Sequence, residues 1–469
     1  MTQRKVPLMK LLYFLPLLFL LLGCPNTPEE IPNSTPTNPN PPPNVLLIVT
    51  DDLGWYDLAA YGNPFIETPH LDRLASQGIR FTNGYAAAAI CSPSRAGLLT
   101  GLHPVTVNIT EHIHGNRPAP PGQPLRTPPI DQQLGLQYRT TGELMRDKGY
   151  ATAYIGKWHL GGGQFHPENR GFQLTYGAGA NGLPQSFFWP FFPPGQFTRL
   201  KQETREGDYL TDVLTDKALS FMSDHRDTAF FINLNYYAPH VPIMGKEELV
   251  EKYRQKRAAN PNDSFPDPVY AAMVDAIDQN VGRLLDRLDS LDLAENTLVI
   301  FTSDNGGLSV REVPAFAAHT PPTDNGILRA GKGYLFEGGV RVPWIVRWPA
   351  RVSAGQLLDY PVIGEDVYPT LADLPGMSPL LGNPPADRFQ LWHAPHYTPQ
   401  GGKPSSAIRQ GEYKLVYDYE TEQASLYNLS DDPGEHDDLS ASQAAKTTEL
   451  LTLLQQQLTA LDARYPTPN

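Results

Sequence analysis

Cys91 is the side chain with the clearest capacity for chemistry in this sequence. The chain has 2 cysteines, and the other, Cys24, lies close to the amino terminus, so Cys91 has no disulfide partner in the body of the chain. Small and turn-forming residues follow it, and Pro93 suits the first turn of a helix, where the missing N–H would be unpaired anyway. We therefore expect Cys91 to lie where a helix begins, an environment that lowers a thiol pKa and attracts anions.

Carboxylate and amide oxygens follow two apolar runs of the chain. Asp51 and Asp52 come directly after the run 44–50, which is typical of a strand buried on both faces. Asp304 and Asn305 come just after a similar run. Such oxygens suit Ca²⁺ or Mg²⁺, and open α/β sheets bind ligands at the carboxyl ends of their strands. Each pair could instead be an ordinary surface turn.

Four cationic or imidazole side chains stand where they could contribute to an anion site. They are Arg95, Lys157, His159 and His240. Arg95 lies four residues after Cys91, so the two share a helix face. Lys157 and His159 are separated by one residue, so in an extended segment their side chains point the same way. The same spacing also occurs in solvated loops, and a single loop histidine such as His240 is ordinarily without function.

The elements that must position these residues alternate between strands and helices. Apolar runs predict strands at 44–50, 150–155, 230–234, 298–302 and 344–348. Helical patterns separate several of them, notably at 209–223 and 268–290. Thr68, Pro69 and Gly78 predict the start and end of a further helix. This alternation favours a mostly parallel α/β sheet.

Charge and the amino terminus limit the class of protein. The net charge of −13 argues against nucleic acid as a partner, and it requires a local cationic pocket for any anionic substrate. Residues 1–24 resemble a lipoprotein signal, with an apolar run at 11–22 that is too short to span a membrane and a box that ends at Cys24. We expect a lipidated Cys24, with 25–43 as an extended Pro/Asn/Thr-rich linker; an ordinary secretory signal is the alternative. This predicts an exported bacterial lipoprotein anchored to a membrane, in the periplasm or at the cell surface.

Several motifs together resemble the type I sulfatases of the alkaline phosphatase superfamily. The segment 91–101 reads Cys-Ser-Pro-Ser-Arg-Ala-Gly-Leu-Leu-Thr-Gly, like the signature of that family. The segment 156–161 reads Gly-Lys-Trp-His-Leu-Gly, and 328–333 resembles the segment that carries the second lysine of the family. The phrase Leu-Tyr-Asn-Leu-Ser-Asp-Asp-Pro-Gly-Glu at 426–435 also matches. The resemblance covers nearly all of 44–469.

The resemblance implies an α/β fold with two parts. The catalytic domain, 44–350, would contain a large, mostly parallel or mixed central sheet flanked by helices. A smaller α+β subdomain, 351–469, would follow. Its short strands at 413–417 and 425–429 would lie in an antiparallel sheet, packed by an amphipathic helix at 442–463.

The resemblance also implies the cofactors. A formylglycine-generating enzyme would convert Cys91 to formylglycine (3-oxoalanine), and one hydroxyl of the hydrated aldehyde would attack sulfur. A divalent ion would lie beside it, calcium in most of the family and magnesium as the alternative. The implied metal ligands are Asp51, Asp52, Cys91, Asp304 and Asn305.

The family mechanism assigns a role to each cationic or imidazole residue. Arg95, Lys157 and Lys332 would stabilise charge on the sulfuryl oxygens. His240 would protonate the departing alkoxide, and His159 would take a proton from the second hydroxyl. An exported, tethered enzyme of this kind suggests a carbohydrate sulfate as substrate.

The sugar subsite is the least defined part of the sequence. His112 and His114 in one loop, with His393 and His396 in a later stretch, could contact sugar hydroxyls. Packing of these loops against the core is the alternative. Two other functions stay open: a phosphate or phosphonate monoester hydrolase of the same superfamily, and a surface glycan-binding lipoprotein without catalysis.

Overall fold

A computed structural model describes residues 41–113, 122–193, 196–259, 265–310, 321–374, 376–382, 384–385 and 387–469. Its centre is an eight-stranded sheet with the order β10-β2-β9-β8-β1-β7-β5-β6. The strands are β1 (Asn44–Thr50), β2 (Ile79–Phe81), β5 (Ala151–Gly156), β6 (Leu174–Tyr176), β7 (Phe230–Asn235), β8 (Thr297–Ser303), β9 (Trp344–Arg347) and β10 (Gln356–Leu358).

Strand β1 is the axis of this sheet, because it pairs in parallel with both β7 and β8. Val45 and Leu47 point into one apolar core, and Leu46 and Ile48 point into the other. Residues that alternate in this way explain why the run is apolar throughout. Strand β9 runs antiparallel to β8, so the sheet is mixed.

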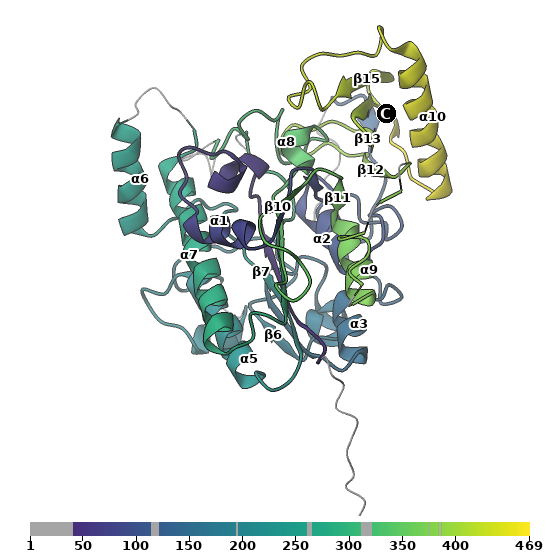
Figure 1. The fold of residues 1–469 in the computed structure, drawn as a ribbon. Helices are drawn as coiled ribbons and strands as arrows, with labels where there is room; N and C mark the ends of the chain where they lie inside the picture. Colours follow the sequence, from purple (N-terminus) through teal and green to yellow (C-terminus); the bar gives the residue numbers. More distant parts are fainter. Residues whose placement is uncertain are drawn as a thin grey trace, which may run out of the picture. The chain divides into compact units, whose positions relative to one another are not determined.

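Helices cover both faces of the sheet, as Figure 1 shows. One face carries α1 (Pro69–Ser76), α5 (Leu210–Asp224), α6 (Glu247–Ala259) and α7 (Pro268–Ser290). The other carries α2 (Cys91–Thr100), α3 (Thr141–Asp147) and α9 (Val367–Ala372). The expected α/β fold class is therefore confirmed.

Short elements complete the large part of the fold. The remaining helices are α4 (Thr198–Gln202) and α8 (Glu337–Val340), with 3₁₀ turns η1 (Trp55–Asp57), η2 (Ala59–Tyr61), η3 (Gly163–Phe165), η4 (Pro167–Asn169) and η6 (Gly364–Asp366). Two small ladders pair β3 (Gly84–Tyr85) with β11 (Val362–Ile363), and β4 (Leu125–Arg126) with β16 (Thr467–Pro468).

A second, antiparallel sheet forms near the carboxyl terminus. Its strands are β12 (Phe389–Ala394), β13 (Ser405–Gln410), β14 (Tyr413–Asp418) and β15 (Gln423–Asn428), in that order. Helix α10 (Ala444–Ala460) packs on it through Leu450, Leu454 and Leu458, as the amphipathic pattern predicts. The expected α+β part is present.

Three sequence expectations need comment. Helix α1 begins at Pro69, but the Thr68 hydroxyl accepts from Ala59 N at 3.0 Å and donates to Asp72 at 3.2 Å, and does not cap the helix. The boundary at 350 stays a prediction, although β10 beyond it joins the large sheet. The expected signal 1–24, with Cys24, and residues 25–40 of the expected linker lie outside the described residues. Among those residues, no helix has both the length and the apolar character to span a membrane.

Candidate active site

The carboxyl ends of β1 and β8 bring Asp51 and Asp52 together with Asp304 and Asn305. Asp52 N donates to Asp304 Oδ1 at 3.3 Å, and Asn305 Nδ2 donates to Asp52 Oδ1 at 2.8 Å. Asp51, Asp52 and Asp304, which we call the carboxylate set, are each at most 1% exposed. The surface-turn alternative therefore does not describe these residues.

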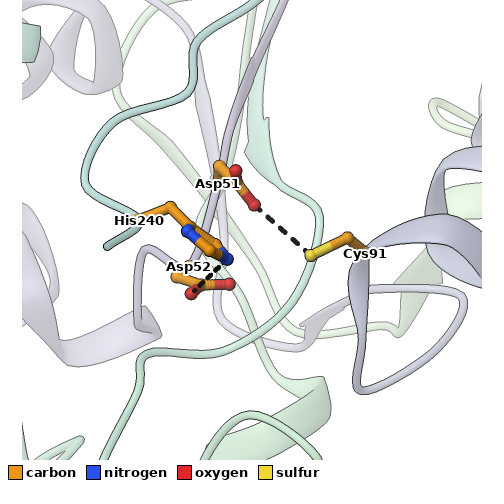
Figure 2. Close-up of side chains that lie close together, drawn as sticks. All are labelled: Asp51, Asp52, Cys91 and His240. Carbon is orange, nitrogen blue, oxygen red and sulfur yellow. Dashed lines mark hydrogen bonds and ion pairs between the residues drawn. The ribbon is translucent and has the colours of Figure 1, made fainter. Parts of the chain in front are cut away.

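Asp52 has an unusual backbone conformation that serves this arrangement. Its φ of 68° lies in the left-handed region, which aspartate tolerates better than most residues. In a regular strand, neighbouring side chains point to opposite faces. Because Asp52 leaves the strand geometry, its carboxylate and that of Asp51 both approach Cys91 and His240 (Figure 2).

Cys91 is the first residue of α2, as the sequence predicted, with Ile90 as the extended residue before it. Its Sγ lies 3.5 Å from Asp51 Oδ1, and its side chain is buried. Ligand atoms of Asp51, Asp52, Cys91 and His240 all lie within 4.8 Å of one another. Figure 2 shows these four side chains converging from three separate segments.

Three buried cations, which we call the cation set, surround the carboxylate set. They are Arg95, Lys157 and Lys332. Arg95 Nε donates to Asp304 Oδ2 at 2.9 Å. Lys157 Nζ donates to Asp51 Oδ2 at 2.6 Å, and Lys332 Nζ donates to Asp52 Oδ2 at 2.8 Å. Each cation that was predicted to bind the anion is thus paired with one carboxylate that was predicted to bind the metal. The cation set and the carboxylate set therefore form one continuous shell of ion pairs.

The two predicted catalytic histidines approach this shell from opposite loops. His240 Nδ1 lies 2.8 Å from its neighbour's carbonyl oxygen, Val241 O, so this nitrogen carries the proton. His240 Nε2 is then the acceptor for Lys332 Nζ, 2.9 Å away. His159 Nε2 lies 3.3 Å from Ile113 O and donates to it, which leaves Nδ1 as the basic nitrogen. Within the described part of the chain, the buried Nδ1 of His159 has no hydrogen-bond partner by distance and angle.

The segment that carries Lys157 and His159 is not extended, contrary to the expectation. His159 has a φ of 57°, so the chain turns there, and its N–H donates to Gly179 O at 3.1 Å. Both side chains still act on Cys91. The turn at His159 therefore brings the side chains of Lys157 and His159 to the same site, as an extended segment was expected to do.

The environment of Cys91 favours its ionised form. Burial raises the pKa of the thiol, and the positive charges of Lys157 and Lys332 lower it. The neighbouring imidazoles of His112 and His159 act in the same direction, and the pKa of the thiol is well below its ordinary value. The position therefore stabilises negative charge at residue 91.

The donor set fits a hard divalent cation. Asn305 Oδ1 is buried, and no described residue donates a hydrogen bond to it, so this oxygen is available as a ligand. Burial raises the pKa of Asp51 well above its ordinary value, although Lys157 lies beside it, and the neighbouring Asp304 adds to the rise. Crowded carboxylates of this kind need positive charge.

The Asp, Cys and His ligand atoms that lie within 4.8 Å of one another differ from the predicted ligand set in two residues. The group includes His240 and omits Asp304. Asp304 is paired with Arg95, whose guanidinium lies 2.8 Å from Asp304 Oδ2.

The predicted sugar-binding histidines divide into two groups. His112 Nδ1 lies 3.1 Å from Glu111 Oε1, and His396 Nδ1 lies 3.9 Å from Glu111 Oε2, so one carboxylate links the two histidines. Burial lowers the pKa of His112, but the hydrogen bonds and negative charges of Cys91 and Glu111 together raise the value to about 9. His393 is engaged elsewhere, with Ser406 Oγ at 2.7 Å and Arg464 O at 3.0 Å. His114 lies outside the described residues.

Two residues of the site were missed by the sequence reasoning. Glu111 joins His112 to His396, yet only its neighbours were selected. Asn235, the last residue of β7, accepts from Arg95 at 3.0 Å through Oδ1. The rule that selected Asp51, a polar side chain at the end of a buried strand, would also have selected Asn235.

Comparison with known proteins agrees with this architecture. The profile of the family described as Sulfatase matches residues 43–377. A protein named Sulfatase from Formosa agariphila is 31% identical, over 92% of this chain and 91% of that protein. Human N-acetylgalactosamine-6-sulfatase is 33% identical over 74% of this chain, and the match spans 64% of the human protein, less than two thirds of its length. The crystal structure of Ps i-CgsB in complex with k-i-k-neocarrahexaose has a TM-score of 0.72 and 29% identity, and the match covers 89% of this chain and 92% of that chain.

The helix-flanked mixed sheet, with its polar cluster at the carboxyl ends of the strands, defines a hydrolase of the alkaline phosphatase-like class. Within that class, the chain belongs to the sulfatase family. It is therefore a sulfuric ester hydrolase.

Proposed function

We propose that this protein hydrolyses sulfate monoesters of a carbohydrate, with formylglycine at residue 91 as the nucleophile and a divalent cation, calcium or magnesium, beside it. The observation that carries the proposal is the position of Cys91 at the first residue of α2, 3.5 Å from Asp51 and enclosed by the carboxylate and cation sets. A thiol used only for packing would not need this concentration of charge.

The charges explain why a metal ion belongs to the proposal. The three carboxylates offset the three cations, so the protein alone provides no net positive charge for an anion. A divalent cation held by the carboxylate set and Asn305 Oδ1 would make the pocket positive. This matters in a chain with a net charge of −13, which repels anions at long range.

In this site, the aldehyde would supply a hydroxyl nucleophile as its hydrate, and the metal would lower the pKa of that hydroxyl and withdraw charge from the sulfuryl oxygens. Lys157 and Lys332 bind the sulfuryl oxygens as charge builds up on them. Arg95 holds Asp304 and, through Lys157 O at 3.0 Å, fixes the segment that carries Lys157.

The leaving oxygen receives its proton from the Lys332–His240 pair. His240 Nδ1 is fixed by Val241 O, so the proton between Lys332 Nζ and His240 Nε2 is the one available to the departing alkoxide. A sugar alkoxide is a poor leaving group, so this proton matters. On the other side, His159 Nδ1 accepts the proton that must leave residue 91 to complete the cycle.

Atoms and charges balance over one turnover. The hydrate oxygen of residue 91 would bond to sulfur as the sulfur–oxygen bond of the ester breaks, and the sugar oxygen gains a proton. The carbon–oxygen bond at residue 91 would then break as the second hydroxyl loses its proton, so that sulfate leaves with this oxygen and the aldehyde returns. Water hydrates the aldehyde again, so the oxygen that ends on sulfate comes from water. No electron transfer is involved, so the reaction needs no oxidant or reductant.

A carbohydrate is the substrate class that we propose. Ps i-CgsB was crystallised with k-i-k-neocarrahexaose, and the human relative is named for N-acetylgalactosamine. The histidines linked by Glu111 add donors beside the nucleophile that suit sugar hydroxyls, with His112 16% exposed. We assign this role to His112 and His396, and retain His114 as a candidate. The internal hydrogen bonds of His393 favour packing for that residue.

We also propose that the protein is an exported lipoprotein, anchored through Cys24 and held away from the membrane by the linker 25–43. A formylglycine-generating enzyme would be its maturation partner. Labelling with a fatty-acid analogue tests the anchor: label on the wild type that disappears in Cys24→Ala supports it, and unlabelled wild type contradicts it.

The proposed activity is tested by comparing kcat/KM for an aryl sulfate and the matched aryl phosphate, followed by a panel of sulfated mono- and oligosaccharides. We expect sulfate to be preferred and at least one sugar sulfate to be hydrolysed. Preference for the phosphate would indicate a phosphate or phosphonate ester hydrolase instead. Aryl sulfate activity without any sugar sulfate activity would contradict the substrate class.

The Cys91→Ala variant separates catalysis from simple glycan binding. We expect this variant to retain its fold and lose turnover. Unchanged biological function in Cys91→Ala would favour a glycan-binding lipoprotein.

A further inference from the structure

Three sequence segments that the mechanism leaves without a role meet in one buried cluster. Glu337 follows the loop that carries Lys332, Lys414 lies on β14, and Glu435 ends the segment 426–435 of the carboxyl-terminal part. Lys414 Nζ lies 2.8 Å from Glu337 Oε1 and 3.0 Å from Glu435 Oε1, and all three side chains are 0% exposed. We call these residues the Lys414 cluster.

The Lys414 cluster touches the loop that carries Lys332 at its carboxyl end. Glu337 N donates to Glu435 Oε2 at 2.6 Å, so a backbone group at the end of this loop is held by the carboxyl-terminal part. Tyr85 OH donates to Glu337 Oε2 at 2.8 Å. The carboxylate of Glu337 is thereby fixed on both sides.

The amino end of the same loop is held by the same part of the protein. Arg329 NH1 donates to Glu435 O at 2.8 Å and to Tyr427 OH at 3.1 Å. Gly338 N donates to Arg329 O at 2.9 Å, so the two ends of the loop are bonded to each other. Glu435 therefore contacts both ends, through its backbone at one and its carboxylate at the other.

Between these ends, Lys332 has little freedom. Its N–H donates to Gly307 O at 3.0 Å, and the next residue, Gly333, donates to Ala89 O at 2.8 Å. A Cβ on Gly338 would lie 2.4 Å from Ala330 O, and one on Gly339 would lie 2.0 Å from Tyr334 O. A loop packed this closely transmits a shift of its ends to Lys332.

The cluster is also an unusual way to join two parts of a fold. Buried ions are costly to desolvate, and an apolar contact of the same size often stabilises as well or better. What a buried ion pair adds is a defined geometry. That property is useful where the placement of one ammonium group, Lys332 Nζ, decides whether a proton reaches the leaving group.

We propose that the Lys414 cluster positions Lys332, so that the four-stranded sheet β12–β15 is part of the catalytic apparatus. Lys414, Glu337 and Glu435 are positioning residues: they act through the loop, and they touch neither Lys332 Nζ nor its partners Asp52 and His240 in the described structure. The inference rests on the proposed function, since it takes Lys332 and His240 as the pair that serves the departing oxygen.

The charge-balanced variant Lys414→Met/Glu435→Gln tests this inference. It removes one positive and one negative charge together, and Glu337 keeps the guanidinium of Arg341, 3.5 Å from its Oε2, as an ion partner. We expect faster amide hydrogen exchange in the peptide that contains Lys332. We also expect kcat to fall about 100-fold for an ester with a poor leaving group, such as a sugar alcohol, because small displacements at a reacting centre have effects of that size. The loss should be smaller for nitrophenyl sulfate, which needs little protonation.

Arg388→Met is the matched control. It breaks a buried contact of the same carboxyl-terminal part, between Arg388 and Asp366 at 2.6 Å, without touching the Lys332 loop. It should lower the melting temperature without changing the ratio of the two kcat values. Arg329→Met, which releases the other end of the loop, provides a second test if the double variant does not fold.

The outcomes separate the inference from the function on which it rests. We expect Lys332→Ala to abolish the turnover that the wild type shows. Turnover that survives Lys332→Ala would overturn the role of Lys332 and the inference with it. If Lys332→Ala is inactive, but the double variant or Arg329→Met keeps both the exchange rate and the kcat ratio of the wild type, only the inference is overturned.

Discussion

Replacement of Lys157 by methionine removes the most deeply buried positive charge of the site. Lys157 Nζ lies 2.6 Å from Asp51 Oδ2, and both side chains are 0% exposed. Methionine fills similar space, so the main loss is the charge, which leaves Asp51 buried beside the other carboxylates. Removing one partner of a buried ion pair costs about 3–5 kcal/mol, and a bound cation would offset part of it, so we expect about 3 kcal/mol. Loss of one group that stabilises developing charge lowers kcat about 100- to 1,000-fold.

The assay is denaturant unfolding at fixed calcium concentration, together with kcat for an aryl sulfate. Lys446→Met is the control, because Lys446 pairs with Glu449 at 2.8 Å on the surface, with the side chains 26% and 56% exposed. A pair of this kind contributes about 0–1 kcal/mol. If Lys157→Met costs no more free energy of unfolding than the control, the pair is not buried as described. If kcat changes by less than about threefold, Lys157 does not act on the reacting sulfate.

Three further predictions concern the metal, the histidine pair and pH. A ligand at 100 times its Kd stabilises a protein by about 2.7 kcal/mol, so chelation of calcium should lower the melting temperature. Asn305→Ala should reduce this calcium-dependent change in melting temperature. A melting temperature that does not depend on calcium would contradict the metal assignment. Glu111→Gln removes a charge that raises the pKa of His112, so NMR titration of protein with unmodified Cys91 should give a value below about 9, and an unchanged value would refute the contact. Burial raises the pKa of Glu365 from its ordinary 4.5 to about 8, so the unfolded state ionises first and stability falls as pH rises through that window. Glu365→Gln should therefore gain stability relative to the wild type between pH 4.5 and about 8, and a gain that does not grow with pH would be inconsistent with this account.

Much of the fold could be predicted from local patterns. A short apolar run rich in β-branched residues, such as 44–50, favours a strand buried on both faces, and the helix over Pro268–Ser290 shows its apolar face in the sequence. The order of the strands could not be obtained in the same way. Strand β9 reads as an apolar run whichever way it points, and its antiparallel direction depends on the path of the chain between β8 and β9.

For the site, the sequence indicated which residues take part but not which side chains contact one another. Position at a strand or helix end selected Asp51 and Cys91, and the resemblance of 328–333 to the family selected Lys332. The partners of each side chain depend on contacts between distant segments. The link from Glu111 to His396, for example, joins a loop near α2 to a loop after β12, and no local pattern encodes it.

The chemical identity of residue 91 tests the central claim most directly. Mass spectrometry of the peptide that contains this residue, taken from enzyme of known specific activity, distinguishes a thiol from an aldehyde, and a carbonyl-reactive probe confirms the assignment. We expect the aldehyde, in a fraction that rises in proportion to activity across preparations. Fully active enzyme with an unmodified thiol at position 91 would contradict the account.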